Sequence, residues 1–126
     1  MLPEKHRLKT KKDFDYVYEK GKKYRTEFFL AIVTPKDPQE LPEVFELPRF
    51  GFVASQKVGK AVKRNRAKRR LREIIRQQFP RLKKDFEAVY ICFNTLPDSK
   101  PDELEDAVVK SLRKFDLFQD SDVSGK

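Results

Sequence analysis

The sequence predicts an α+β fold, a small two-layer α-β sandwich in which helices cover one sheet. Three apolar runs have the length and composition of buried strands; they are residues 28–34, 49–55 and 88–94. Three further segments keep apolar residues at helical spacing; they are residues 11–20, 60–79 and 101–115. With a possible short strand at 44–47, the elements follow the order α-β-(β)-β-α-β-α.

The chain has 126 residues, of which 38% are hydrophobic, enough for one domain with a modest core. We assign this domain to residues 1–118 and expect the polar residues 119–126 to form a mobile tail. No apolar run approaches the roughly 20 residues that span a bilayer, and the N-terminus lacks the apolar stretch of a signal peptide. We therefore expect a cytoplasmic protein that does not bind membranes. The one cysteine, Cys92, lies in the run VYICF and is interpreted as a buried strand residue rather than a nucleophile.

Capping signals bound the first helix at both ends. Thr10 is its predicted N-cap, and Asp13 is the capping-box partner three residues later. Gly21 occupies the position where a C′ glycine commonly ends a helix. The apolar run FFLAIVT then forms the first predicted strand.

Residues 35–48 hold four of the eight prolines and four acids, which predicts an extended, exposed connection that does not contact RNA. Pro80 ends the middle helix, and Ser99 is the predicted N-cap of the last one. Acids cluster at 102–106 in that last helix. A metal site is one interpretation, and favourable interaction with the helix dipole is the preferred one.

Positive charge is concentrated in one segment. The chain has 29 basic and 20 acidic residues, and residues 57–76 hold ten of the basic residues but only one acid, Glu73. The rest of the chain has 19 basic and 19 acidic residues, so this segment carries the whole net charge of +9. A charge focused in this way predicts a polyanionic partner.

A helical wheel separates this segment into two faces. One is an apolar stripe for the core; its residues are Ala67, Leu71, Ile74, Ile75 and Gln78. The rest is cationic and includes an i, i+4 row of like charge; its residues are Lys60, Arg64, Lys68, Arg72 and Arg76. Each like-charged pair costs about 0.2–0.5 kcal/mol, and solvated helices normally mix signs. Because arginine also matches phosphate bidentately, we predict a phosphate-rich partner rather than a solvated face.

Aromatic residues provide a second candidate surface. Phe14 and Tyr18 lie one helical turn apart, so they share a face of the first helix. Most strand aromatics are expected in the core, but a sheet with helices on one face can leave the other face open. An aromatic groove beside a basic helix would suit a single-stranded nucleic acid, whose bases stack while its backbone meets cations.

The motifs of common enzymes are missing from the sequence. The one histidine, His6, has no partner at metal-ligand spacing, and there is no phosphate-binding loop or nucleophile elbow. We therefore predict no catalytic residue and no metal-binding residue in this chain.

The basic segment contains the pattern Lys57-x-Gly59-x-Ala61-Val62-x-Arg64-Asn65-Arg66-x-Lys68-Arg69-x-x-Arg72. It closely resembles the RNR motif of the bacterial ribonuclease P protein component. The opening RL…DF..VY..G, from Arg7 to Gly21, is independently similar to the start of that family. The resemblance covers about residues 3–118.

The resemblance implies a left-handed parallel β-α-β crossover and a protein that assists a catalytic RNA. That RNA removes the 5′ leader of precursor tRNA by Mg²⁺-dependent hydrolysis, and the protein binds the RNA and the leader without a cofactor of its own. The expected RNA contacts lie in the basic segment; they are Lys57, Lys60, Lys63, Arg64, Asn65, Arg66, Lys68, Arg69, Arg72 and Arg76. Asn65 can donate to a phosphate or read a base edge, or it can be inert.

For the leader cleft the resemblance implies Phe14 and Tyr18, and we predict the strand aromatic Phe29 as a third cleft residue. Under this resemblance, a cleft tyrosine that some relatives carry on the first strand corresponds to Ala31. Two rival functions stay open. A structural RNA-binding protein, such as a ribosomal protein, would explain the charge but not the RNR register. A protein-only nuclease would require metal-binding carboxylates, and RNA cleavage by the isolated protein would identify it.

Overall fold

Four strands form one sheet in the computed structural model, which describes residues 2–119. The sheet order is β1-β2-β4-β3; the strands are β1 (Lys22–Arg25), β2 (Phe29–Pro35), β3 (Arg49–Val53) and β4 (Phe86–Cys92). Only β3 and β4 pair in parallel within this sheet. The helices are α1 (Lys11–Lys20), α2 (Ala61–Gln78) and α3 (Pro101–Lys114). The predicted α+β sandwich is thus confirmed, including the parallel β3–α2–β4 connection, whose handedness stays a prediction.

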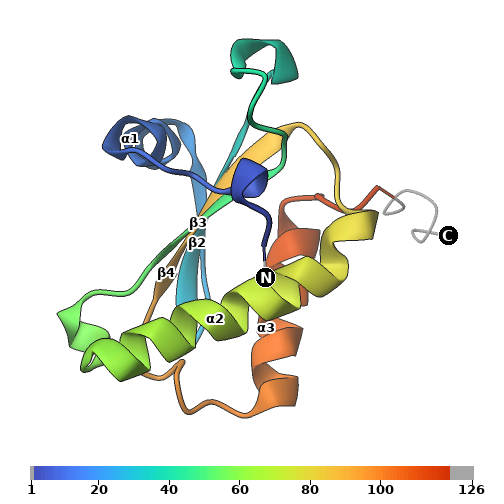
Figure 1. Ribbon diagram of the computed structural model, residues 1–126. Coiled ribbons are helices and arrows are strands. Elements are labelled where there is room, and N and C mark those ends of the chain that lie inside the picture. The colour runs from blue at the N-terminus through green and yellow to red at the C-terminus, as the bar shows by residue number, and fades with distance from the viewer. Residues whose placement is uncertain (1, 120–126) are drawn as a thin grey trace, which may run out of the picture.

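The helices divide between the two faces of the sheet (Figure 1). On one face α2 and α3 cover the main core, which includes Tyr90 and Cys92 of β4. On the other face α1 packs through Val17 onto Ile32 and Val89. Cys92 is buried as predicted, and this burial raises the pKa of its thiol to about 12. No helix among residues 2–119 is long and apolar enough to cross a membrane.

The capping box of α1 forms as predicted, because the Asp13 backbone N–H donates to Thr10 Oγ1 and the Asp13 carboxylate accepts from the Thr10 backbone. Gly21 ends α1 as predicted, but the physical reason for a glycine at this position is different from the one expected. Its φ is −80°, so it adopts an extended conformation and not the left-handed one. A Cβ there would lie 2.5 Å from Ile32 Cγ2, so the position requires glycine for space.

Two local predictions are wrong. Residues 44–47 form no strand, since Val44 lies in a turn, Leu47 lies in a bend and the two residues between them have no regular structure. The extra strand is β1, whose sequence KKYR has no apolar alternation. Lys100, not Ser99, is the N-cap of α3, and the Ser99 hydroxyl donates to the Leu96 carbonyl instead. Gln119 is the first residue of the expected mobile tail, and its backbone N–H donates to the Arg81 carbonyl at 2.7 Å. The remainder of the expected mobile tail, residues 120–126, lies outside the described residues.

The N-terminal segment, residues 2–8, joins the two faces of the sheet. Leu2 is buried in the core under α2 and α3, whereas Leu8 is buried in the cluster under α1. Between them Arg7 forms a bridge with Phe50, and the Leu8 backbone N–H donates to the Phe50 carbonyl at 2.9 Å. The segment therefore pairs with part of the β3 edge and contributes to both clusters.

Candidate nucleic-acid interface

The core stripe of α2 fixes which of its side chains face outward. Ala67, Leu71 and Ile75 are fully buried, whereas Ile74 and Gln78 are only partly so. The wheel prediction is confirmed, although the buried stripe is narrower than the sequence suggests. The cationic residues are consequently held on the exposed sides of a well-anchored helix.

Some of the predicted contact residues already have an acidic partner within the chain. Lys63 Nζ and Arg66 Nη1 lie 3.1 Å and 3.3 Å from the two oxygens of Asp98. Arg76 pairs with Glu73 at 3.0 Å. The remaining cations have no ion-pair partner among residues 2–119; they are Lys57, Lys60, Arg64, Lys68, Arg69 and Arg72. Asn65 is exposed beside them.

The cations of α2 that have no ion-pair partner among residues 2–119 include Arg72, which lies beside β3. The Arg72 guanidinium lies 5.9 Å from the centre of the Phe52 ring. Partial burial and the nearby charge of Arg7 lower the pKa of Arg72. Lys68 and Arg72 both lie close enough to Cys92 to oppose the rise in its pKa. This surface therefore holds positive charges close together without an internal counter-charge.

Arg70 differs from its neighbours because its side chain is used inside the protein. Its guanidinium donates to the carbonyls of Leu96, Pro97 and Ser99 and to the Ser99 hydroxyl, at 2.8–3.2 Å. These bonds hold the β4–α3 loop against α2. Arg70 contributes to the net charge of the segment, but its Nη1 and Nη2 atoms are engaged by this loop.

The aromatic surface of α1 is only partly as predicted. Phe14 and Tyr18 lie together with ring centroids 6.3 Å apart, and Tyr18 is 38% exposed. Phe29, however, is fully buried on the opposite face of the sheet, where it contacts Tyr90. Phe29 therefore cannot line a cleft beside α1. Ala31 is buried on that same opposite face, so a strand residue facing α1 must be Leu30 or Ile32.

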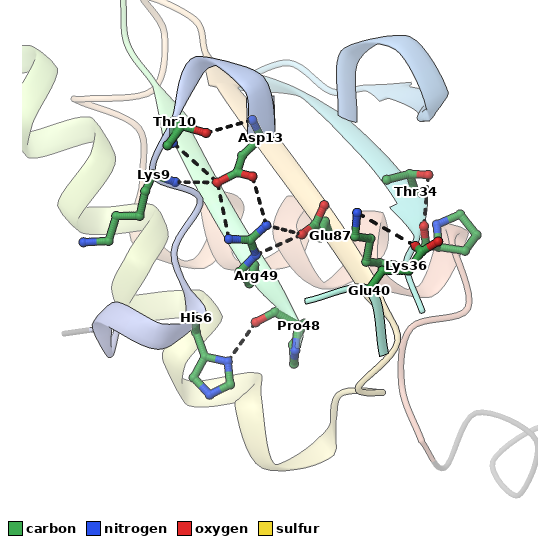
Figure 2. A network of polar contacts seen from close by, with 11 residues as sticks. His6, Lys9, Thr10, Asp13, Thr34, Lys36, Glu40, Pro48, Arg49 and Glu87 are labelled. Atoms are coloured by element: carbon green, nitrogen blue, oxygen red, sulfur yellow. Dashed lines mark hydrogen bonds and ion pairs between the residues drawn. The ribbon is translucent and has the colours of Figure 1, made fainter. Parts of the chain in front are cut away.

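A buried ion-pair network fixes α1 to the sheet (Figure 2). Arg49 Nη2 lies 2.7 Å from Glu87 Oε2, and these two residues are 3% and 1% exposed. The same guanidinium reaches Asp13 of α1 at 3.3 Å. Burial alone would raise the pKa of the Asp13 carboxyl, but Arg49 and two backbone N–H donors lower it overall. The network thereby sets the position of the helix that carries Phe14 and Tyr18.

Two of the three cations on β1, which the sequence analysis left out, lie on the same face of the sheet as α1. Lys23 is paired with Ile32 and Arg25 with Leu30 across the antiparallel ladder, so both side chains lie on the α1 face. Their spacing of two residues would have indicated this shared face, but only once KKYR had been identified as a strand. Among residues 2–119, no group of three or more potential ligands could hold a metal ion.

A family model described as Ribonuclease P matches residues 2–116. The chain belongs to this family. The ribonuclease P protein component of Synechococcus sp. (strain JA-2-3B'a(2-13)) is 35% identical over 98% of this chain and 91% of that protein. The component of Alkaliphilus oremlandii is 31% identical over 90% of this chain and 93% of that protein. The component of Nitratiruptor sp. is 45% identical, but over only 60% of this chain and 61% of its own length.

Solved structures of the ribonuclease P family share the fold. The Staphylococcus aureus RNase P protein superposes with a TM-score of 0.76 at 22% identity, covering 90% of this chain and 98% of that one. The Thermotoga maritima protein gives a TM-score of 0.71 at 26% identity, over 86% and 96% of the two chains. The chain is therefore a ribonuclease P protein component, a role in tRNA processing that implies an RNA partner.

Proposed function

We propose that this protein binds the catalytic RNA of ribonuclease P and the single-stranded 5′ leader of precursor tRNA. The RNA carries out the Mg²⁺-dependent cleavage, and the protein contributes neither a catalytic group nor a metal site. The observation that carries the proposal is the row of unpaired cations on α2, since these charges lack counter-ions within residues 2–119. Phosphates of an RNA would supply the missing negative charge.

Reconstitution with a bacterial ribonuclease P RNA at low Mg²⁺ tests this function. We expect the protein to stimulate cleavage of precursor tRNA at the end of the leader, and the isolated protein to cleave no RNA. A protein that fails to stimulate the RNA would contradict the proposal. Cleavage by the isolated protein would instead support a protein-only nuclease.

Tyr18→Ala is expected to weaken binding of precursor tRNA while leaving binding of mature tRNA unchanged. Loss of one stacked base costs about 1–3 kcal/mol, which corresponds to about a 5- to 150-fold rise in the precursor Kd. Tyr16→Ala is the matched control, because Tyr16 lies on the other flank of α1 with its ring 3.9 Å from Lys36 Nζ. Equal losses for the two tRNAs, or for the two variants, would argue against leader binding beside Tyr18.

Asp98→Asn is expected to increase the affinity for RNA. The Asp98 carboxylate bridges Lys63 and Arg66, and all three side chains are at least half exposed. A phosphate that approaches this pair must displace Asp98 or meet its charge, and exposed ion pairs of this kind contribute little stability. Binding titrations at several salt concentrations should show tighter binding with a steeper salt dependence. Weaker binding would instead show that Asp98 orients the two cations for RNA.

A further inference from the structure

The helix α1 covers only part of its face of the sheet. Val17 is buried against Ile32 and Val89, but the next residues along the strands on this face stay partly exposed; they are Leu30, Val53 and Ile91. Tyr16 and Tyr18 point about 200° apart on the helix, and Tyr16 contacts Lys36 at one end of the strands. Tyr18 therefore points toward the uncovered apolar surface.

The strand β1 places positive charge along this surface. Lys23 and Arg25 are exposed, lie on the α1 face, and have no ion-pair partner among residues 2–119. Lys22, their neighbour on the same strand, lies on the opposite face, where with Lys20 it lines a cavity beside α3. Of the β1 cations, therefore, only Lys23 and Arg25 can contact a ligand that lies beside α1.

The far end of this surface is aromatic. The Arg25 guanidinium lies 4.6 Å from the centre of the Phe93 ring, beside a cavity of about 550 Å³ that Ile91 and Lys57 also line. The Phe93 backbone N–H donates to the Phe28 carbonyl at 2.9 Å. Thr95 Oγ1 donates to the Glu27 carbonyl at 2.8 Å, which fixes the same loop. These bonds fix the backbone of the loop that carries Phe93, and of the charged residues lining the cavity only Glu27 is acidic.

We infer that the leader path continues from Tyr18 across Leu30 and Ile91 to a second nucleotide site formed by Arg25 and Phe93. This inference rests on the proposed function. In the site, a nucleobase stacks on the Arg25–Phe93 pair, while Lys23 and Lys57 neutralise phosphates of the same strand. From Val89 to Phe93 the strand direction advances about 13 Å, so the second site lies beyond the reach of a leader that ends at α1. A duplex hides its bases, so this surface selects single-stranded RNA.

Precursor tRNAs with a short and a long leader test this site when they are bound to the reconstituted holoenzyme. The double variant Lys23→Gln/Arg25→Gln should weaken binding of the long-leader precursor and flatten its salt dependence by a slope of about 0.7, as for the one single-strand phosphate that Lys23 neutralises. Binding of the short-leader precursor should not change. The control Lys20→Gln/Lys22→Gln removes the same charge from the other face and should leave the preference for the long leader unchanged.

Phe93→Leu tests the stacking platform independently of charge. It should reduce the preference for the long leader without changing the salt slope. The inference is overturned if the unmodified protein prefers the long leader and both Lys23→Gln/Arg25→Gln and Phe93→Leu retain that preference. It is also overturned if the control pair reduces the preference equally. If the unmodified protein shows no leader preference, the proposed leader binding itself is wrong.

Discussion

Arg49→Met should lower the free energy of unfolding by about 3–5 kcal/mol, the cost of leaving a buried charge without its partner. Arg49 is 3% exposed and lies between Glu87 and Asp13, which come from β4 and α1. Without the guanidinium, the Glu87 carboxylate would stay buried at 1% exposure without the cation that now compensates its charge. Urea unfolding monitored by circular dichroism measures this loss.

The double variant Arg49→Met/Glu87→Leu is the decisive control for this prediction. Replacing a whole buried ion pair by apolar residues is often close to neutral, so the second substitution should restore most of the stability. If the double variant is as unstable as Arg49→Met alone, the loss comes from packing and not from the unpaired charge. If Arg49→Met lowers the free energy of unfolding by less than 1 kcal/mol, the prediction that Arg49 compensates a buried charge is wrong.

The acid sensitivity of the same network gives a second measurement. Because the pKa of Asp13 is lowered in the folded protein, its contribution to stability is complete above the unfolded pKa of about 3.9. It is lost as the pH falls through the lower, folded value. Asp13→Asn should therefore make the unfolding free energy less dependent on pH below about pH 4.

The triple variant Lys60→Gln/Arg64→Gln/Lys68→Gln should weaken RNA binding and stabilise the free protein. Three lost phosphate contacts flatten the plot of log affinity against log salt concentration by a slope of about 2–3. Removing the three like-charged i, i+4 contacts from Lys60 to Arg72 should add about 0.5–1.5 kcal/mol to the free energy of unfolding. The first turn of α2 contains no acid, so no compensating ion pair is lost there.

A variant that binds RNA more weakly but has a higher free energy of unfolding identifies a binding surface, whereas a merely solvated surface would show no loss of RNA affinity. The matched control removes three exposed lysines elsewhere, as Lys12→Gln/Lys20→Gln/Lys22→Gln, and so changes the net charge equally. Filter binding to the ribonuclease P RNA over a range of salt concentrations gives both slopes. Equal slopes for the two triple variants would mean that RNA senses only the total charge of the protein.

Periodicity in the sequence was sufficient for the helices and for three of the strands, because each buries one regular apolar stripe or run. It failed for β1, a short edge strand whose stability comes from its ladder with β2 and not from apolar side chains. It also failed for residues 44–47, where apolar letters lie between prolines. Strand propensity alone could not show that residues 22–25 form a strand and residues 44–47 do not, because the presence or absence of a pairing strand decides both outcomes.

The candidate site was predictable to the level of the helix face but not of the sheet face. Successive residues of a strand point to opposite faces of the sheet, so an assignment that is off by one residue selects the wrong face. The prediction that Phe29 lines the leader cleft is wrong for this reason, because Leu30 and not Phe29 lies on the α1 face. The buried pairing of Arg49 was not predictable, because its partner Glu87 lies 38 residues away in the sequence. Asp98 was likewise invisible as a partner of Lys63 and Arg66, since only the folded β4–α3 loop brings them together.

The N-terminal segment has a consequence for the order of folding. Its partners lie far along the chain, since His6 meets the Pro48 carbonyl at a separation of 42 residues and Arg7 meets Phe50. We therefore expect these residues to dock only after β3 is in place, because the long loop between them must close first. Since Leu2 and Leu8 belong to different cores, this late step locks both faces of the sheet together. We expect removal of residues 2–8 to uncouple the layer that holds α1 from the layer that holds α2.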